Sequence, residues 1–241
     1  MKAVVVLEAF CNRERYLSLS DLVAITGLDK SSAQRCTRTL KELGYLEQHP
    51  KTRRYAIGRR VLDLSFAYLH SNPLIVRAAP IMIELRQTAR ERVDLSVLDG
   101  PDLIYVYRLQ TKREALSAAL VGKRIPVYSS AGGRALLARL SDDEAMAILA
   151  ASDLQPRTPY TLSDPEAIMA EVRRARTKGY ALQVGEWRPG EIAAAAAVTD
   201  QEGRPIAALH IAGSTTEWSP EDFERRMGPL VAAAAADIGH I

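Results

Sequence analysis

Two short helical patterns follow each other within residues 18–44, and this pairing constrains the fold more than any other feature of the chain. Ser18 predicts the start of the first helix, because Asp21 stands where its carboxylate can complete a capping box. Gly27 follows the last apolar turn, where helices commonly end in a left-handed residue. The sequence therefore predicts a short helix that ends at a glycine.

A second helix is expected over residues 30–43, with Asp29 as its cap and Gly44 at its end. Its apolar positions recur at helical spacing, as one face of an amphipathic helix requires. They are Ala33, Cys36 or Thr37, Leu40 and Leu43. The opposite face has no acid before Glu42 and carries Lys30, Ser31, Gln34, Arg35, Arg38 and Lys41.

A β-hairpin with a basic tip is expected next. Strand-like runs at residues 45–48 and 54–57 flank residues 49–53, which hold a proline and two cations, and Gly58 marks the end of the hairpin. Two helices joined by a short glycine-containing turn, with a hairpin after them, are typical of a winged helix-turn-helix. The second helix is then the candidate recognition helix.

The predicted recognition helix has the side chains that major-groove recognition uses, since Arg can pair bidentately with guanine and Gln with adenine. Contacts to base edges are expected from Ser31, Ser32, Gln34 and Arg35, and Lys30 on the same helix is also expected to bind DNA. Contacts to phosphates and the minor groove are expected from Arg38, Lys41, Lys51, Thr52, Arg53 and Arg54. An ordinary solvated helix face is the alternative, and the adjoining turn and basic hairpin disfavour it.

Charge is unevenly distributed along the chain. The net charge is only +3, yet residues 1–60 hold 12 Lys and Arg against 6 Asp and Glu, and the remainder holds 20 against 23. A basic N-terminal quarter suggests that this end meets a polyanion. Many solvated surfaces carry the same bias, so charge alone does not decide between partners.

The rest of the chain mixes helical and strand patterns. The apolar run at residues 3–11 is expected to be a buried helix, although so short a run can also be a strand. Helical spacing resumes at residues 59–69 and 74–90, which Asn72 and Pro73 separate. Further helices are expected over residues 130–140, after the capping box of Ser141 and Glu144, over 165–179 and after Ser219.

Strand patterns occur in pairs. Residues 93–97 and 104–108 alternate apolar and polar side chains around a turn at 99–102, as in a β-hairpin. Further strands are expected within residues 116–128, at Val184, and at residues 193–199 and 206–212. Because the strands pair and the helices come at intervals, an α/β chain of the α+β type, rich in antiparallel strands, is favoured over a doubly wound sheet.

With these patterns, the chain resembles the IclR family of bacterial transcriptional regulators over nearly its whole length. In the N-terminal part the resemblance rests on SLSDL at residues 18–22, TGLDKSS at 26–32, LKELGYL at 40–46 and RYAIGRRVL at 54–62. In the C-terminal part it rests on GKRIPV at 122–127, GRALLA at 133–138, KGYA at 178–181 and GEIAA at 190–194. The pieces stand in the family's order and at its spacing, which makes the set specific.

The resemblance implies a winged helix-turn-helix at residues 1–58, a linker helix at 59–72 and a GAF-like effector-binding domain at 73–241. It also implies a homodimer, or a dimer of dimers, on partly palindromic double-stranded operator DNA. A small-molecule effector would change the arrangement of the DNA-binding heads through the linker helix, by binding two arrangements with different affinity.

An organic acid, aromatic or not, is the expected effector class. Free N–H groups at the start of the helix predicted over residues 130–140 attract carboxylates, and the small residues 131–133 would let a ligand approach the backbone. Candidate effector contacts are Tyr128, Ser129, Ser130, Ala131, Gly132, Gln183, Trp187, Ala193, His210 and Ala212. The alternative for His210 is a packed or surface histidine, and tyrosines at alternate strand positions are usually core.

Three departures from the family pattern border the expected ligand pocket. Residues 182–185 read LQVG where members commonly carry acidic residues, and His210 replaces the usual small hydroxyl residue. Residues 129–133 are also richer in glycine than usual. The ligand is therefore expected to differ from the small keto acids known for some members.

Other functions find little support in the sequence. The 4 histidines and 2 cysteines show no metal-ligand spacing, and neither a G-x-S-x-G elbow nor a phosphate-binding loop occurs. We expect no enzyme activity, no cofactor and no metal. The few cysteines and the absence of a signal peptide or a long apolar run indicate a cytoplasmic protein with no membrane partner. The rival hypothesis is a GAF-like ligand-binding module whose basic head contacts protein or RNA.

Overall fold

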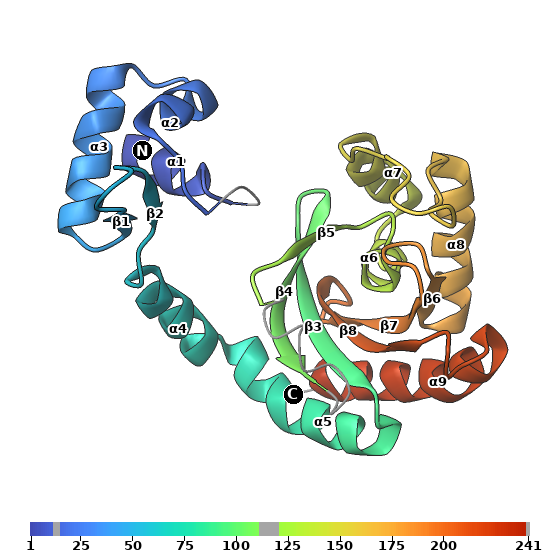
Figure 1. The fold of residues 1–241 in the computed structure, drawn as a ribbon. Coiled ribbons are helices and arrows are strands. Elements are labelled where there is room, and N and C mark those ends of the chain that lie inside the picture. The colour runs from blue at the N-terminus through green and yellow to red at the C-terminus, as the bar shows by residue number, and fades with distance from the viewer. Residues whose placement is uncertain (12–14, 111–120, 240–241) are drawn as a thin grey trace. The chain divides into compact units, whose positions relative to one another are not determined.

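A computed structural model describes residues 1–11, 15–110 and 121–239, and the chain divides into two compact units, Met1–Ser71 and Asn72–Ile241 (Figure 1). The first unit contains three helices, a two-stranded wing and a further helix. They are α1 (Lys2–Glu8), α2 (Leu19–Thr26), α3 (Lys30–Glu42), β1 (Leu46–Gln48), β2 (Tyr55–Ile57) and α4 (Val61–Ser71). The helix expected in the apolar run at residues 3–11 is confirmed as α1.

The caps predicted for α2 and α3 are confirmed. The Ser18 hydroxyl accepts a hydrogen bond from the Asp21 amide at 3.1 Å, and the Asp21 carboxylate accepts one from the Ser18 amide at 2.8 Å. Gly27 is left-handed, with φ of +67°. The Asp29 carboxylate then accepts the Ser32 amide at 2.7 Å. Local hydrogen bonds therefore fix the turn between the two helices.

The core of the first unit forms where α1, α2, α3 and the wing meet. Each of these elements contributes buried side chains, among them Val6, Leu22, Leu40 and Leu46. Of the two alternatives for the apolar face of α3, Thr37 is fully buried and Cys36 lies half-buried at the margin of this core. In the wing, β1 and β2 pair antiparallel with Glu47 opposite Ala56.

The second unit contains one six-stranded sheet and five helices among its described residues. They are α5 (Pro73–Ala89), β3 (Arg92–Asp99), β4 (Asp102–Leu109), β5 (Arg124–Pro126), α6 (Ala131–Leu137), α7 (Asp142–Ala150), α8 (Pro165–Lys178), β6 (Ala181–Val184), β7 (Glu191–Thr199), β8 (Pro205–Ser214) and α9 (Pro220–Gly239). Neighbouring strands are antiparallel in the order β5-β4-β3-β8-β7-β6. The expected antiparallel α+β architecture is confirmed. Of the strands expected within residues 116–128, the structure contains β5, and residues 116–120 lie outside the described residues.

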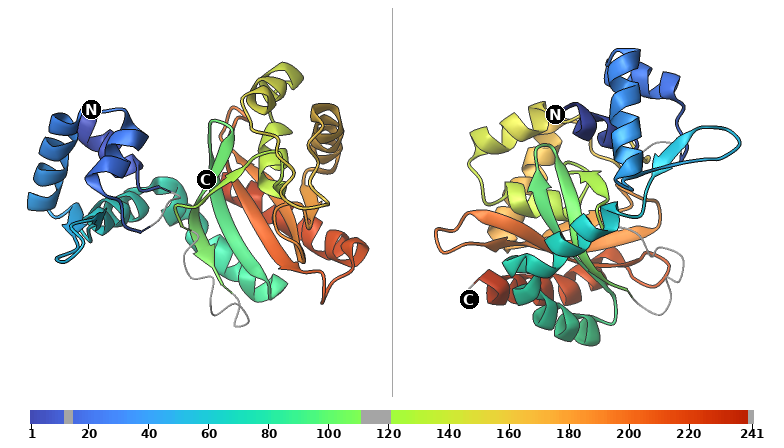
Figure 2. Two further views of the ribbon diagram at one scale, coloured as in Figure 1. Left: turned by 45° about the horizontal axis from the view of Figure 1, so that its top comes forward. Right: turned by 90° about the vertical axis from the view of Figure 1, so that its left-hand side faces the viewer.

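The sheet of the second unit is curved and carries helices on both faces (Figures 1 and 2). Helices α5 and α9 pack on one face, α6 packs on the other, and α8 packs on α6. On the α6 side, Asp94 stands opposite His210 and Ser96 opposite Ala208 in the β3–β8 register. Alanines dominate the neighbouring positions of β7 and β8, including Ala193 and Ala212, so α6 can lie close to the strands.

Candidate functional site

The outward face of α3 is polar and exposed. The exposed residues of α3 are Lys30, Ser31, Gln34, Arg35, Arg38, Thr39, Lys41 and Glu42. Ser32, which is expected to contact a base edge, differs from these residues: it is only 2% exposed, and its hydroxyl accepts a hydrogen bond from Lys2 Nζ at 2.9 Å. Hydrogen bonds from Ser31 and Ser32 hold the pKa of Asp29 well below its usual range, so the cap remains ionised.

Three long side chains of this face, Lys30, Gln34 and Arg35, make no ion pair within the described residues, whereas Arg38 does. Arg38 Nε donates to Glu42 Oε1 at 2.8 Å, so that guanidinium already has an ionic partner. Arg35 makes a long contact of 3.3 Å from Nη2 to the Ser32 hydroxyl, and the side chain of Gln34 has no hydrogen bond within the described residues. Arg35 and Gln34 are therefore the side chains best placed to meet a base edge.

Hydrogen bonds tie the wing to α3. Lys41 Nζ donates to Gln48 Oε1 at 3.0 Å, and Gln48 Nε2 donates to the Arg53 carbonyl at 2.9 Å. Arg53 itself is left-handed, with φ of +59°. The expected phosphate-binding residues of the wing are all exposed: Lys51, Thr52, Arg53 and Arg54. The hydrogen-bonded wing therefore carries these exposed side chains next to α3.

The residues expected to bind an effector lie in the packed interior between α6 and the sheet. Nine of the ten are buried: Tyr128, Ser129, Ser130, Ala131, Gly132, Gln183, Ala193, His210 and Ala212. The fold does bring distant ones together, because Ala193 faces Gln183 on one side and Ala212 on the other. Trp187 is half-buried at the edge of the same cluster.

The start of α6 differs from the open backbone that its small residues led us to expect. Ser130 caps the helix by accepting the Gly133 amide at 3.0 Å. A Cβ atom on Gly133 would lie 2.1 Å from the carbonyl oxygen of Val127, and one on Gly132 would lie 2.0 Å from Cε1 of His210. These glycines make room for other atoms of the protein.

His210 lies on this sheet face among polar groups. Its Nε2 atom is 2.7 Å from the Ser96 hydroxyl, and its ring centroid is 5.4 Å from that of Tyr105. Burial lowers the pKa of His210 to about 4 despite the opposing charge of Asp94, so the ring is neutral near pH 7. The hydroxyl of Ser129 is buried with no hydrogen-bond partner among the described residues.

Four charged side chains beside His210 neutralise one another, and sequence reasoning missed them. Arg92 Nε donates to Asp94 at 2.9 Å, and Arg108 Nε donates to the same carboxylate at 2.6 Å. Arg92 Nη2 also donates to Glu191 at 2.8 Å. Charged residues alternating with apolar ones in β3 and β4 were the available signal. Their mutual pairing depends on strand register, which the sequence did not supply.

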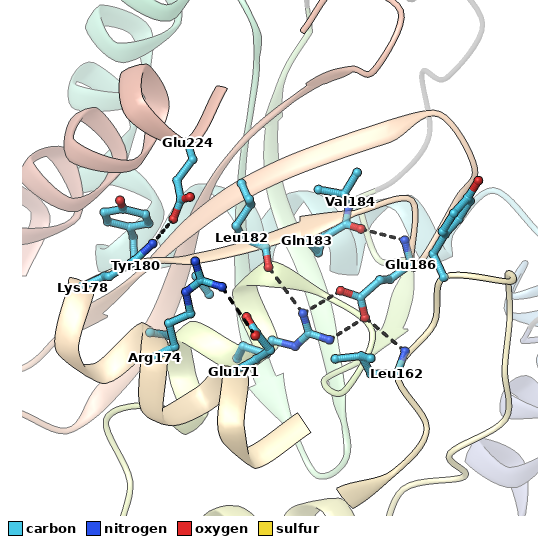
Figure 3. Close-up of a pocket in the computed structure, with 14 residues that line it drawn as sticks. Leu162, Glu171, Arg174, Lys178, Tyr180, Leu182, Gln183, Val184, Glu186 and Glu224 are labelled. Carbon is cyan, nitrogen blue, oxygen red and sulfur yellow. Dashed lines mark hydrogen bonds and ion pairs between the residues drawn. The ribbon is translucent and has the colours of Figure 1, made fainter. Parts of the chain in front are cut away.

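A second buried ion pair anchors the loop between β6 and β7. Arg134 is 1% exposed, and its Nη1 donates to Glu186 Oε1 at 2.7 Å while its Nη2 donates to Oε2. The Glu186 carboxylate also accepts the Leu162 amide at 3.3 Å. The pair borders a cavity of about 320 Å³ beside β6 and α8 (Figure 3), whose other charged residues are Glu171, Arg174, Lys178 and Glu224.

Trp187, the next residue in this loop, carries two cations over its ring. The guanidinium carbon of Arg157 is 4.7 Å from the ring centroid, and Lys123 Nζ is 5.3 Å from it. Neither cation has a carboxylate partner within the described residues. Trp187 also packs against the cluster that contains Tyr128 and Ala131. Lys123 and Arg157 were not predicted as site residues, because only the fold brings them to Trp187.

Neither metal ligation nor membrane insertion is indicated by residues 1–11, 15–110 and 121–239. This part of the chain holds no group of three or more His, Cys, Asp or Glu side chains able to bind a metal ion. None of the helices in this part of the chain is both long enough and apolar enough to cross a membrane.

Comparison with known families accounts for both units. The IclR helix-turn-helix domain matches residues 1–50, and the C-terminal domain of the bacterial transcriptional regulator IclR matches residues 66–240. The Pca regulon regulatory protein of Pseudomonas putida is 31% identical over 240 residues, 99% of this chain and 82% of that protein. The repressor AllR of Escherichia coli K12 is 29% identical over 221 residues, 92% of this chain and 81% of that protein.

Solved structures agree with this match. An IclR transcriptional regulator from Alicyclobacillus acidocaldarius superposes with a TM-score of 0.83 at 25% identity, covering 98% of this chain and 95% of the other. An IclR homologue from Microbacterium hydrocarbonoxydans, solved in complex with 4-hydroxybenzoate, superposes with a TM-score of 0.80 at 25% identity and the same coverage.

Proposed function

The chain belongs to the IclR family of bacterial transcriptional regulators, and we propose that α3 reads its operator while an organic acid in the second unit sets operator affinity. DNA binding and control of transcription follow from the family. Which residues bind the DNA and which bind the effector is our proposal. The observation that carries the DNA-binding assignment is the exposed polar face of α3 beside a hydrogen-bonded basic wing.

An acid fits the second unit because two cations of this unit that lie over Trp187 have no carboxylate partner within the described residues. The buried Arg92, Arg108 and Arg134 are all neutralised by carboxylates. Lys123 and Arg157, over Trp187, have no carboxylate partner within the described residues. A ligand carboxylate there would gain charge-assisted hydrogen bonds, and its ring would reach the cluster under α6. The 4-hydroxybenzoate complex of the Microbacterium homologue supports an aromatic acid as the first compound to try.

The first test is operator binding with and without 4-hydroxybenzoate. Fluorescence anisotropy with the DNA upstream of the chain's own gene should show tighter binding than to scrambled DNA, weakening with salt. The acid should change that affinity by about 5–150-fold, the usual range for coupled sites. Tight binding to RNA or protein instead of duplex DNA would favour the rival interaction-module hypothesis.

Two neighbouring cations provide a matched pair for the acid site. Lys123→Gln should abolish the acid's effect on operator affinity and on the melting temperature, because it removes an unpaired charge next to Trp187. Arg124→Gln should leave both effects in place, since Arg124 is also exposed but pairs with Asp99 and Asp102. No change in affinity or melting temperature with any aliphatic or aromatic acid would refute the proposed effector class.

We also propose that α4 joins two copies of the chain, within a linker spanning residues 59–72. None of its residues is buried, and it exposes Leu62, Leu64, Phe66 and Tyr68. A helix that is apolar on several sides requires cover. A second copy supplies the same apolar surface, and two heads on one DNA would bind with higher avidity than one.

Phe66→Asp is expected to convert the dimer into a monomer, because a carboxylate would be buried in an apolar interface. Sedimentation equilibrium should show half the mass, and operator affinity should fall by about 100-fold through lost avidity. Ser65→Asp, at an exposed polar position of the same helix, is the control for added charge. A Phe66→Asp protein that keeps its mass and affinity would rule out α4 as the interface.

A further inference from the structure

Gly132 and His210 are in closer contact than any residue larger than glycine would allow. A Cβ at position 132 would lie 2.0 Å from Cε1 and 2.5 Å from Nε2 of the imidazole. Real Cβ atoms do not approach other atoms so closely, so the ring occupies the space that a side chain at 132 would need. The two residues come from α6 and β8, which puts the imidazole between the helix and the sheet.

The imidazole is held in this place from several directions. The Ser96 hydroxyl is 2.7 Å from Nε2, and the Tyr105 ring lies against the imidazole. Asp94, its partner across the β3–β8 register, is occupied by two arginines and makes no hydrogen bond to it. His210 is 2% exposed. Its position is therefore fixed by packing and one hydrogen bond, and it is not a member of the ion-pair network.

We propose that His210 is the residue that determines effector size in this chain, because its imidazole fills part of the space under α6 and restricts the site to acids of one ring. The proposal rests on the effector site proposed above. It goes further by assigning selectivity to one contact, that of His210 with Gly132. With a small residue at position 210, the same backbone would leave room next to Gly132 for a second ring.

The position of His210 also defines the chemistry that the effector meets. The arginines on this face are paired with Asp94 and Glu191, so the imidazole presents an uncharged surface. The orphan hydroxyl of Ser129 supplies one hydrogen-bonding group close by in the chain to Gly132. An acid that puts its carboxylate at Trp187 would therefore place an uncharged ring, with at most a small hydroxyl group, towards His210.

The test compares two acids by thermal shift and by titration on the full-length protein. The probes are 4-hydroxybenzoate, with one ring, and 6-hydroxy-2-naphthoate, with two. Wild type should bind the first and not the second. His210→Ala and His210→Ser should bind both. The dissociation constant of the two-ring acid divided by that of the one-ring acid should fall by about tenfold or more relative to wild type. Both His210 variants are used so that the test still works if one of them fails to fold.

Leu209→Ala is the control for an added cavity, because this buried neighbour in β8 points to the opposite face of the sheet. It should leave the ratio of dissociation constants unchanged. Equal binding of both acids by wild type, or an unchanged ratio in both His210 variants, would overturn the size limit while leaving the acid proposal intact. Failure of every protein to bind either acid would overturn the size limit, whereas the effector class falls only if no aliphatic or aromatic acid changes operator affinity or melting temperature.

A second measurement tests the contact itself. Gly132→Ala should lower the melting temperature of wild type, because the new methyl group meets the imidazole. The same substitution should cost much less in the His210→Ala background, where the ring is gone. Equal losses in both backgrounds would show that the two residues do not compete for space, and the proposal would fall.

Discussion

Replacing Arg35 with alanine is expected to weaken operator binding by about 1–3 kcal/mol while leaving binding to scrambled DNA nearly unchanged. Arg35 is exposed on α3, and its guanidinium makes only one long hydrogen bond, to Ser32. A side chain so placed can form a bidentate pair with guanine. Because a base contact carries sequence information, its loss should reduce the ratio of specific to non-specific affinity.

Lys51→Ala is the matched comparison, since Lys51 is an exposed cation at the tip of the wing. If Lys51 meets a phosphate, its removal should weaken binding to both DNA sequences similarly and reduce the slope of log affinity against log salt by about one. Both substitutions are at the surface and should change stability by no more than about 0.5 kcal/mol. Equal losses on operator and scrambled DNA for Arg35→Ala would assign Arg35 to the backbone instead.

The DNA-binding unit could be predicted well from sequence because its determinants are local. The capping box of Ser18 and Asp21 spans four residues, and Asp29 caps α3 through the amide of Ser32. The turn at Gly27 lies between them. Ser32 shows the opposite case. Ser32 is buried, and its hydroxyl accepts a hydrogen bond from Lys2, thirty positions earlier in the chain, a contact that helix periodicity does not report.

The second unit was predictable in its strands and helices but not in its site, for a related reason. The alternation of apolar and polar side chains in β3 and β4 predicted the hairpin. The positions of the buried charges depend on which strands become neighbours. Gly132 suggested an open backbone, and only the fold shows that His210 fills the space. A glycine allows close approach without stating whether a ligand or the protein makes it.

The largest effect on stability is expected from Glu186→Ala, which should lower the free energy of unfolding by about 3–5 kcal/mol. The substitution leaves the Arg134 guanidinium, 1% exposed, without its carboxylate partner. The remaining acceptors are the carbonyl oxygens of Tyr128 and Leu182, at 3.2 and 3.4 Å. These two neutral carbonyl groups do not compensate a buried guanidinium for the loss of its carboxylate partner.

Chemical denaturation of three variants would separate the ion pair from its surroundings. Glu171→Ala removes an acid from the wall of the same cavity, but its partner Arg174 is exposed, so the expected loss is only about 0–1 kcal/mol. The double change of Arg134→Met with Glu186→Leu should recover most of the stability lost in Glu186→Ala, because no unpaired charge remains. A Glu186→Ala protein as stable as Glu171→Ala would show that Arg134 finds another partner.

The same ion pair offers a test of the proposed acid site, because Glu186 precedes Trp187 in the loop that it anchors to α6. If the pair only stabilises the fold, the double variant should respond to 4-hydroxybenzoate like wild type. If it positions Trp187 for the acid, the double variant should be stable yet have lost the response of Trp187 fluorescence to the acid, measured in a Trp218→Phe background. We expect the second result, because a Met and a Leu can fill the volume of the pair without its bidentate geometry.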